Sequence, residues 1–157
     1  MEINIGIGDK KRQKIADGVK TVLASSYTLY VKTHNFHWNV TGPHFRTFHV
    51  MFEEQYTELA PALDLLAERV RSLGDYAPGS FKQFEQLSVI KGTDKVPAAL
   101  KMVDILRKDH EALIRAARPV LELAAEAGDD ATADLITERL RLHEKTAWML
   151  RSILEKP

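Results

Sequence analysis

The sequence predicts an all-α protein and, within that class, a four-helix bundle. Apolar residues recur every three or four positions along four long stretches, which is the spacing of an amphipathic helix. No stretch shows the strict alternation that is typical of a strand, and the connections between the stretches are short, long and short in turn. At 157 residues we expect one domain, 1–157, with a short tail at 1–8, large enough to bury about 70% of its unfolded surface.

The first helix is expected from Asp9 to about Phe36. Asp9 is a candidate N-cap, because a short carboxylate accepts hydrogen bonds from N–H groups that have no partner in the first turn. The apolar stripe of this helix comprises Ile15, Val19, Val22, Leu23, Leu29 and Tyr30. The segment 39–43 ends it and predicts a short turn.

The second helix is expected to follow at once. Thr41 or Gly42 is its candidate cap, and Pro43 falls in the first turn, where the missing N–H group costs nothing. The apolar spacing runs on to about Leu73, and Gly74 is the expected stop. These two helices therefore form a first hairpin.

Prolines inside two of the predicted helices conflict with a straight rod. Pro61 lies within the second helix and Pro119 within the third. An interior proline costs about 3 kcal/mol or bends the helix. A bend is therefore expected at each.

The long connection and the second hairpin complete the pattern. Ser80 and Gln83 match a capping box, which predicts a short helix over 81–86 between the second and third long helices. The third helix is expected from Asp94, its cap, to about residue 127, with Pro97 in the first turn. The fourth runs from Asp129 or Asp130 to about residue 154. Two hairpins joined by one long crossover are the ferritin-like arrangement of a four-helix bundle.

Composition excludes several classes of function. The 22 basic and 22 acidic side chains cancel, so the total charge does not call for nucleic acid. The absence of cysteine excludes disulfides and thiolate zinc sites. The sequence has no run of 18 apolar residues and no signal-peptide pattern at its start, so the expectation is a soluble cytoplasmic protein with no membrane partner.

Two pairs of potential metal ligands lie on the second helix. His49 and Glu53 form one pair and Asp64 and Glu68 the other, each spaced i, i+4 so that both members face the same way. The pairs are separated by roughly 16 Å at 1.5 Å of rise per residue, whereas a metal–ligand bond is about 2 Å long. Either these are two inactive half-sites, or a second chain related by a two-fold axis completes each one.

A di-iron centre inside a single bundle would usually need Glu-x-x-His from two helices. The histidines are His34, His37, His44, His49, His110 and His143. The residues three positions before them are Val31, His34, Thr41, Arg46, Arg107 and Leu140. None is a carboxylate, which favours the interpretation that the site lies between subunits.

One set of residues resembles a known family, and the predicted helix layout with its short middle helix resembles that family along the whole chain. The set is His37-Trp38-Asn39-Val40-x-Gly42, then Phe45, His49, Phe52-Glu53 and Asp64-x-x-Ala67-Glu68-Arg69. It resembles the Dps family, the DNA-binding proteins from starved cells, which are mini-ferritins of the ferritin-like superfamily. The resemblance implies a hollow homo-dodecamer that oxidises iron(II), preferably with hydrogen peroxide, stores the ferric mineral inside and protects against oxidative damage.

The resemblance also implies a ligand set. His37 and His49 would come from one subunit, and Asp64 and Glu68 from its two-fold mate. Glu53 would bind or position the second of two iron ions in each inter-subunit ferroxidase site. Imidazoles and carboxylates are ligands that suit iron.

Other residues have two interpretations. Trp38 would lie beside the site, either as a redox-active side chain or as simple interface packing. His34 is structural or lies behind the ligands, and His110 and His143 are structural or at the surface. The resemblance also implies an acidic pore for iron entry near the start of the last helix. Its acidic cluster is either pore lining, with Asp134 preferred, or helix capping at a favourable position of the helix dipole; the cluster is Glu126, Asp129, Asp130 and Asp134.

DNA binding is possible but is not expected to be tight. The basic residues Lys10, Lys11, Arg12 and Lys14 lie at the start of the first helix and form either a weak, salt-dependent phosphate contact or a solvated face. The main alternative function is a nucleoid-coating protein with incidental metal binding. A further alternative is a bundle that binds zinc or another ion only for assembly.

Overall fold

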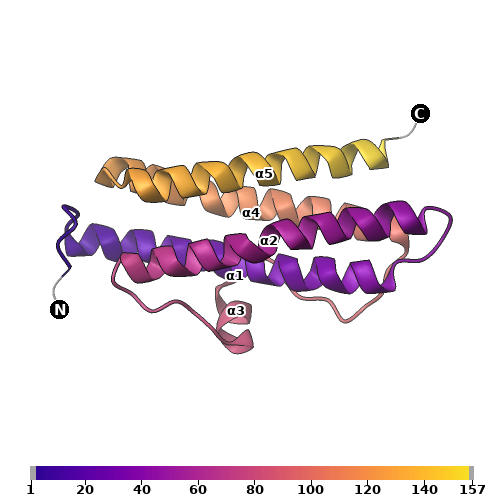
Figure 1. Cartoon of the computed structure of the whole chain (residues 1–157), viewed down its shortest axis with the longest axis horizontal. Coiled ribbons are helices and arrows are strands. Elements are labelled where there is room, and N and C mark those ends of the chain that lie inside the picture. Colours follow the sequence, from indigo (N-terminus) through magenta and orange to yellow (C-terminus); the bar gives the residue numbers. More distant parts are fainter. Residues whose placement is uncertain (1–2, 156–157) are drawn as a thin grey trace.

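The computed structural model describes residues 3–155, and these contain helices and no strand. The helices are α1 (Asp9–Asn39), α2 (Phe45–Ser72), α3 (Phe81–Leu87), α4 (Ala99–Ala127) and α5 (Asp130–Leu154). Helices α1 and α2 form one hairpin and α4 and α5 the other, with α1 also packed against α4 and α3 (Figure 1). The all-α bundle with a short extra helix between its second and third long helices is therefore confirmed.

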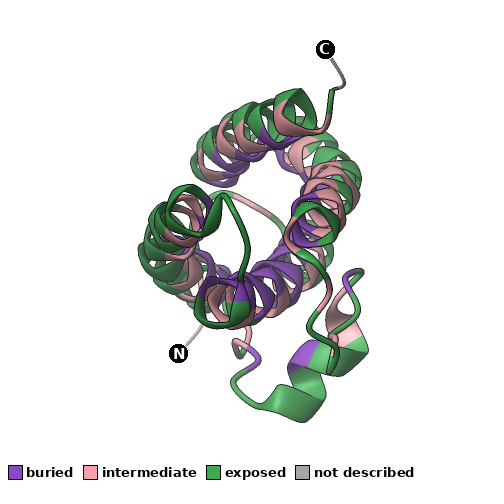
Figure 2. Ribbon diagram, turned by 90° about the vertical axis from the view of Figure 1, so that its right-hand side faces the viewer, coloured by how far each residue is buried: buried purple, intermediate pink, exposed green. Residues whose placement is uncertain are grey.

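The core lies along the axis of the bundle. Residues from all four long helices are fully buried there, including Phe36, Phe52, Leu66, Leu106 and Leu150. Viewed from the end, the buried residues line the inner faces of the helices and the exposed ones line the outer faces (Figure 2). This is the distribution that an amphipathic stripe on each helix requires. No helix within residues 3–155 is both long enough and apolar enough to cross a membrane.

The first helix differs from its prediction at both ends. Gly8, not Asp9, occupies the N-cap position, and it makes no side-chain cap. Asp9 is the first helical residue and instead accepts a hydrogen bond from Arg12. The helix runs past Phe36 to Asn39, which places the histidine of the motif inside its last turn.

The turn into α2 also begins differently from the prediction. Pro43 lies before the helix rather than in its first turn, and His44 is the N-cap. Gly42 adopts φ +112°, a conformation that side-chain-bearing residues rarely adopt, and this turn uses the next two residues before the helix begins. At the other end, Leu73 is the C-cap and Gly74 follows with φ +95°, so the predicted stop is confirmed.

The interior prolines do not interrupt their helices. Both α2 and α4 continue through Pro61 and Pro119. Both prolines are exposed, so the carbonyl group that loses its intrahelical partner lies on the side that water reaches. Because α2 is one element, the separation along it that was inferred from the sequence holds.

The capping box of α3 is confirmed, but the start of α4 is not where Asp94 predicted it. Ser80 accepts from the Gln83 backbone, and the Gln83 side chain accepts from the Ser80 backbone. Helix α4 begins later, at Ala99, with Pro97 outside it. The physical reason is that proline disfavours the helical conformation in the residue before it, so the chain stays extended through this stretch.

The junction between α4 and α5 matches its prediction. Gly128 ends α4 in the left-handed region with φ +71°. The Asp129 side chain accepts a hydrogen bond from the Thr132 N–H group at 3.0 Å and caps α5.

Candidate metal centre

His37 and His49 meet where the first hairpin closes. His37 lies in the last turn of α1 and His49 in the first turns of α2. Their rings stack with centroids 3.8 Å apart and planes 20° apart. The turn at Gly42 brings the two helix ends together, so this contact depends on the backbone and not on the histidines alone.

Each ring is held by the backbone of the other residue. His37 Nδ1 lies 2.8 Å from the His49 carbonyl oxygen, and His49 Nδ1 lies 2.8 Å from the His37 carbonyl oxygen. A carbonyl oxygen can only accept, so each Nδ1 must carry the proton and donate it. In the neutral rings, both Nε2 atoms therefore keep a lone pair, which is the state in which imidazole binds a metal.

Aromatic side chains support this pair. Phe45 stacks on His49 with centroids 5.0 Å apart, and Tyr56 meets His37 edge-on at 5.2 Å. His37 is 8% exposed and His49 is half-buried. The rings are thus fixed in orientation but still reachable from outside the subunit.

The three carboxylates of the predicted site lie on the surface of α2. Glu53, Asp64 and Glu68 are all exposed, and none takes part in an ion pair within residues 3–155. Arg69 follows Glu68 directly, but its guanidinium donates to Asp129 at 2.6 Å and to Thr132 at 2.8 Å instead. The carboxylates therefore remain uncompensated in the isolated subunit.

The subunit does not bring all five predicted ligands together. Glu53 and Asp64 are eleven residues apart on one continuous helix, which is roughly 16 Å of rise. Across the described part of the chain, no three His, Asp or Glu side chains form a group that could hold a metal ion. The structure joins His37 to His49 and leaves Asp64 and Glu68 away from them.

Sequence reasoning missed Tyr56 as a neighbour of the histidine pair and gave His34 too little weight. Tyr56 stacks on His34 with centroids 4.2 Å apart, and His34 packs against Trp38 at 4.0 Å. Burial, and then the neighbouring His37, lower the pKa of His34. Tyr56 follows His49 by seven residues, two helical turns along the same face, and this spacing would have identified it. Trp38 is 65% exposed and packs on the surface of this cluster.

The acidic residues at the start of α5 are not equivalent. Asp129 is 2% exposed and is bound by Arg69 and Thr132, so it is structural. Asp134 and Glu126 are exposed. Asp134 stays the predicted pore residue.

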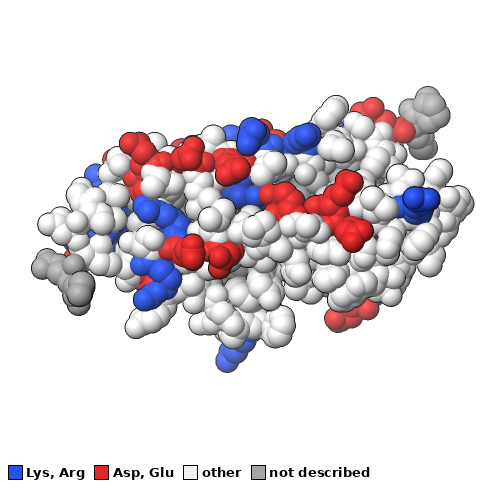
Figure 3. Space-filling view, viewed as in Figure 1, with Lys and Arg blue, Asp and Glu red and all other residues white. Residues whose placement is uncertain are grey.

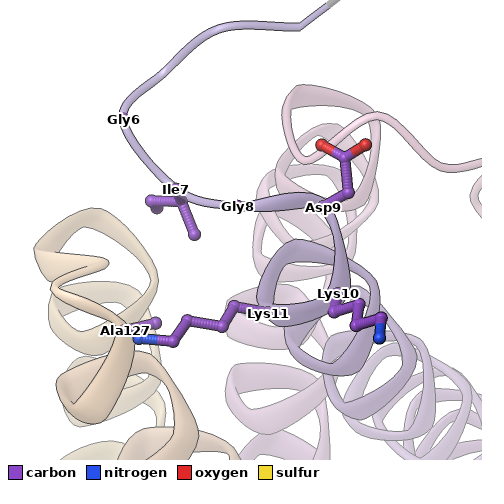
Figure 4. A pocket seen from close by; sticks show the side chains of 7 residues that line it. All are labelled: Gly6, Ile7, Gly8, Asp9, Lys10, Lys11 and Ala127. Carbon is purple, nitrogen blue, oxygen red and sulfur yellow. The ribbon is translucent and has the colours of Figure 1, made fainter.

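The basic residues at the start of α1 are divided between two roles. A pocket there is lined by Gly6, Ile7, Gly8, Asp9, Lys10, Lys11 and Ala127 (Figure 4). Arg12 is not part of a solvated face, because it is buried and donates to the carbonyl oxygens of Ile7 at 3.1 Å and Leu73 at 3.0 Å. Over the face formed by α2 and α5, acidic and basic side chains are interspersed (Figure 3).

Known proteins are similar to this chain over nearly its full length. A family profile described as a ferritin-like domain matches residues 17–157. An uncharacterized low temperature-induced protein of Nostoc sp. is 45% identical over 155 residues, covering 98% of this chain and 87% of that protein. The DNA protection during starvation protein of Brevibacillus brevis is 38% identical over 144 residues, covering 92% of this chain and 97% of that protein.

Solved structures of Dps proteins are similar to this chain in fold as well as in sequence. A DPS protein from Vibrio cholerae O1, described as a member of a superfamily of ferritin-like diiron-carboxylate proteins, has 33% identity and a TM-score of 0.93, covering 99% of this chain and 98% of that one. A Dps protein from Bacillus brevis has 36% identity and a TM-score of 0.90, covering 99% of this chain and 100% of that one. The fold, the family profile and these relatives together show that the chain belongs to the ferritin-like family and, within it, to the Dps proteins.

Proposed function

We propose that this protein is a ferroxidase mini-ferritin. It oxidises iron(II) with hydrogen peroxide at sites between subunits, stores the ferric product inside a hollow dodecamer in the cytoplasm, and so limits oxidative damage. The observation that carries the proposal is the reciprocal hydrogen bonding of His37 and His49, which leaves both Nε2 atoms as ligands. Membership of the Dps proteins supports it.

The second half of each site is proposed to come from a second subunit. Two copies of α2 that run antiparallel across a two-fold axis would place Asp64 and Glu68 of one copy against His37 and His49 of the other. The exposure of both carboxylates and their lack of ion-pair partners within residues 3–155 fit this arrangement. One axis then creates two equivalent sites.

The ligand chemistry suits iron as the substrate. Two imidazoles and the carboxylates bind iron(II), and the negative carboxylates favour the more highly charged iron(III) product. Glu53, one turn after His49, is proposed to hold the second of the two ions. Two iron(II) ions supply the two electrons that convert one hydrogen peroxide and two protons into two water molecules, so hydroxyl radical is not released.

Tight DNA binding is not part of the proposal. Ile7, just before α1, is linked to the end of α2 because Arg12 donates to the carbonyl oxygens of both Ile7 and Leu73. The charges over the α2 and α5 face are mixed rather than uniformly basic. Any attraction to phosphates would then be weak and strongly dependent on salt.

The test is stopped-flow iron oxidation with a matched histidine control. Iron(II) is loaded without oxygen, peroxide is added, and the double variant His37→Ala/His49→Ala is compared with His44→Ala, which changes an exposed histidine between them. We expect the double variant to lose the fast phase and the control to keep it, with both keeping the mass of the wild-type shell. Fast oxidation in the double variant would overturn the ligand assignment, and a wild-type rate no higher than buffer would overturn the ferroxidase function. Loss of the shell on chelation, without iron oxidation, would instead favour a metal used only for assembly.

A further inference from the structure

A second histidine pair lies in the interior of the bundle, unconnected with the proposed ligands. His110 of α4 is 3% exposed and His143 of α5 is 1% exposed. Their Nδ1 atoms are 2.9 Å apart and their ring centroids 5.0 Å apart. Burial within one subunit means that the environment of the pair does not depend on how subunits assemble.

The neighbours of the pair determine where its protons lie. Arg139 donates to His143 Nε2 at 3.4 Å, and since a guanidinium can only donate, this Nε2 must accept. The proton of neutral His143 is therefore on Nδ1, which donates to His110 Nδ1. The proton of His110 is then on Nε2, and that buried atom has no hydrogen-bond partner among the described residues.

The carboxylates near the pair are already engaged by cations. On α5, Arg139 forms a bidentate salt bridge with Glu58 of α2, with N–O distances of 2.5 and 3.0 Å. On α1, Lys32 is bound to Asp109 of α4 at 2.5 Å. The carboxylates that directly follow the two histidines are paired as well: Glu144 with Arg118 of α4 at 2.5 Å, and Glu111 with Arg107 at 3.0 Å and Arg151 at 3.1 Å.

An extra proton on either ring would thus be a buried charge beside a guanidinium with no free carboxylate to balance it. Burial, and then Arg139, lower the pKa of His110 to about 3. Burial, then His110, then Arg139 lower the pKa of His143 well below its usual value. Both rings are therefore neutral in the folded subunit through the mildly acidic range.

We propose that this buried pair makes the seam between α4 and α5 acid-labile, so that opening of the bundle takes up two protons. In the unfolded chain both imidazoles titrate near the ordinary histidine pKa of about 6.5. The folded pKa values are lower, so the contribution to stability is complete above about pH 6.5 and is lost as the pH falls below it. With two protons taken up, the folding equilibrium constant falls up to about 100-fold per pH unit, or about 2.7 kcal/mol at 1.36 kcal/mol per tenfold change.

The experiment measures proton uptake during unfolding of the assembled, iron-free protein. Urea unfolding is followed by circular dichroism between pH 7.5 and 4.8 at one fixed protein concentration, because subunit association contributes to the stability. The wild type is compared with His110→Leu/His143→Leu, which removes both titrating groups and leaves Arg139 with Glu58. His44→Gln, at an exposed position outside the bundle core, is the matched control.

We expect the dependence of stability on pH to be steeper in the wild type and in the control than in the double variant, by about two protons. If the double variant does not fold, His110→Gln and His143→Gln are measured singly, and each is expected to lower the slope by about one proton. Equal slopes in the wild type and the histidine-free variants would overturn the proposal. The test is independent of the metal centre, since no proposed iron ligand is changed.

Discussion

Mixing two inactive variants tests whether the metal centre is shared between subunits. His37→Ala/His49→Ala removes the imidazole half, and Asp64→Asn/Glu68→Gln removes the carboxylate half with little change in volume. If each site takes its histidines from one subunit and its acids from the mate, every site in either pure variant lacks one half. Both variants alone should therefore show no fast oxidation, although each has only one half altered.

The expected recovery follows from the two-fold arrangement. Random pairing of equal amounts makes half of all two-fold pairs mixed. In a mixed pair one site combines both intact halves and the other combines both altered halves, so about one quarter of all sites are intact. The co-refolded mixture should recover about one quarter of the wild-type fast phase.

The assay is stopped-flow oxidation of iron(II) by peroxide on a mixture refolded from urea, with light scattering to verify that the shell has formed. Glu54→Gln is the control, because Glu54 is exposed beside Glu53 but is not a proposed ligand. An intact mixed shell without recovered activity would refute the shared site. Full activity in either pure variant would refute the ligand assignment.

Three further predictions concern stability and are checked by urea unfolding. Ser80→Ala removes the capping box of α3 and should cost about 1 kcal/mol, with Ser152→Ala at an exposed helical position as control. Gly18→Ala should be destabilising by about 1 kcal/mol although alanine favours helices, because its Cβ would lie 2.8 Å from a methyl group of buried Val120; Gly79→Ala, which meets nothing within 4 Å, should be nearly neutral. Arg69→Ala should cost about 2–3 kcal/mol at neutral pH by leaving Asp129 buried without its cation. Burial acts to raise the pKa of Asp129, but the hydrogen bonds from Thr132 and Arg69 outweigh it and lower that pKa. This contribution is therefore present above about pH 4 and lost below it, so the difference between wild type and variant should shrink in acid; a constant difference would contradict this account.

The parts of the fold that depend on local chemistry were predictable from the sequence. The capping box at Ser80, the helix stops at Gly74 and Gly128 and the cap at Asp129 each need only the residues beside them. The start of α4 was not predictable from Asp94, because the effect of Pro97 on the preceding residue outweighed the preference of aspartate for a cap.

In the candidate site, too, features set by neighbouring residues were predictable and features set by the packing of distant segments were not. The i, i+4 spacing of the proposed ligands on α2 is visible in the sequence, and the family resemblance added His37 to the proposal. The reciprocal bonds of His37 and His49 were not predictable, because they depend on the turn at Gly42 bringing the end of one helix to the start of the next. The pairing of His110 with His143 depends likewise on the register of α4 against α5, which no local pattern encodes.

The reciprocal hydrogen bonds of His37 and His49 have a consequence for how the proposed shell would assemble. Because His37 and His49 donate to each other's main chain, the hydrogen bonds that join the two helix ends also fix the direction of the Nε2 atoms proposed to bind iron. A newly folded monomer would carry its imidazoles already in position, and association would need only to deliver the opposing acids. Substituting either histidine should then weaken the contact between the end of α1 and the start of α2 as well as the binding of iron. The same two side chains would thus serve both the stability of the hairpin and the proposed activity.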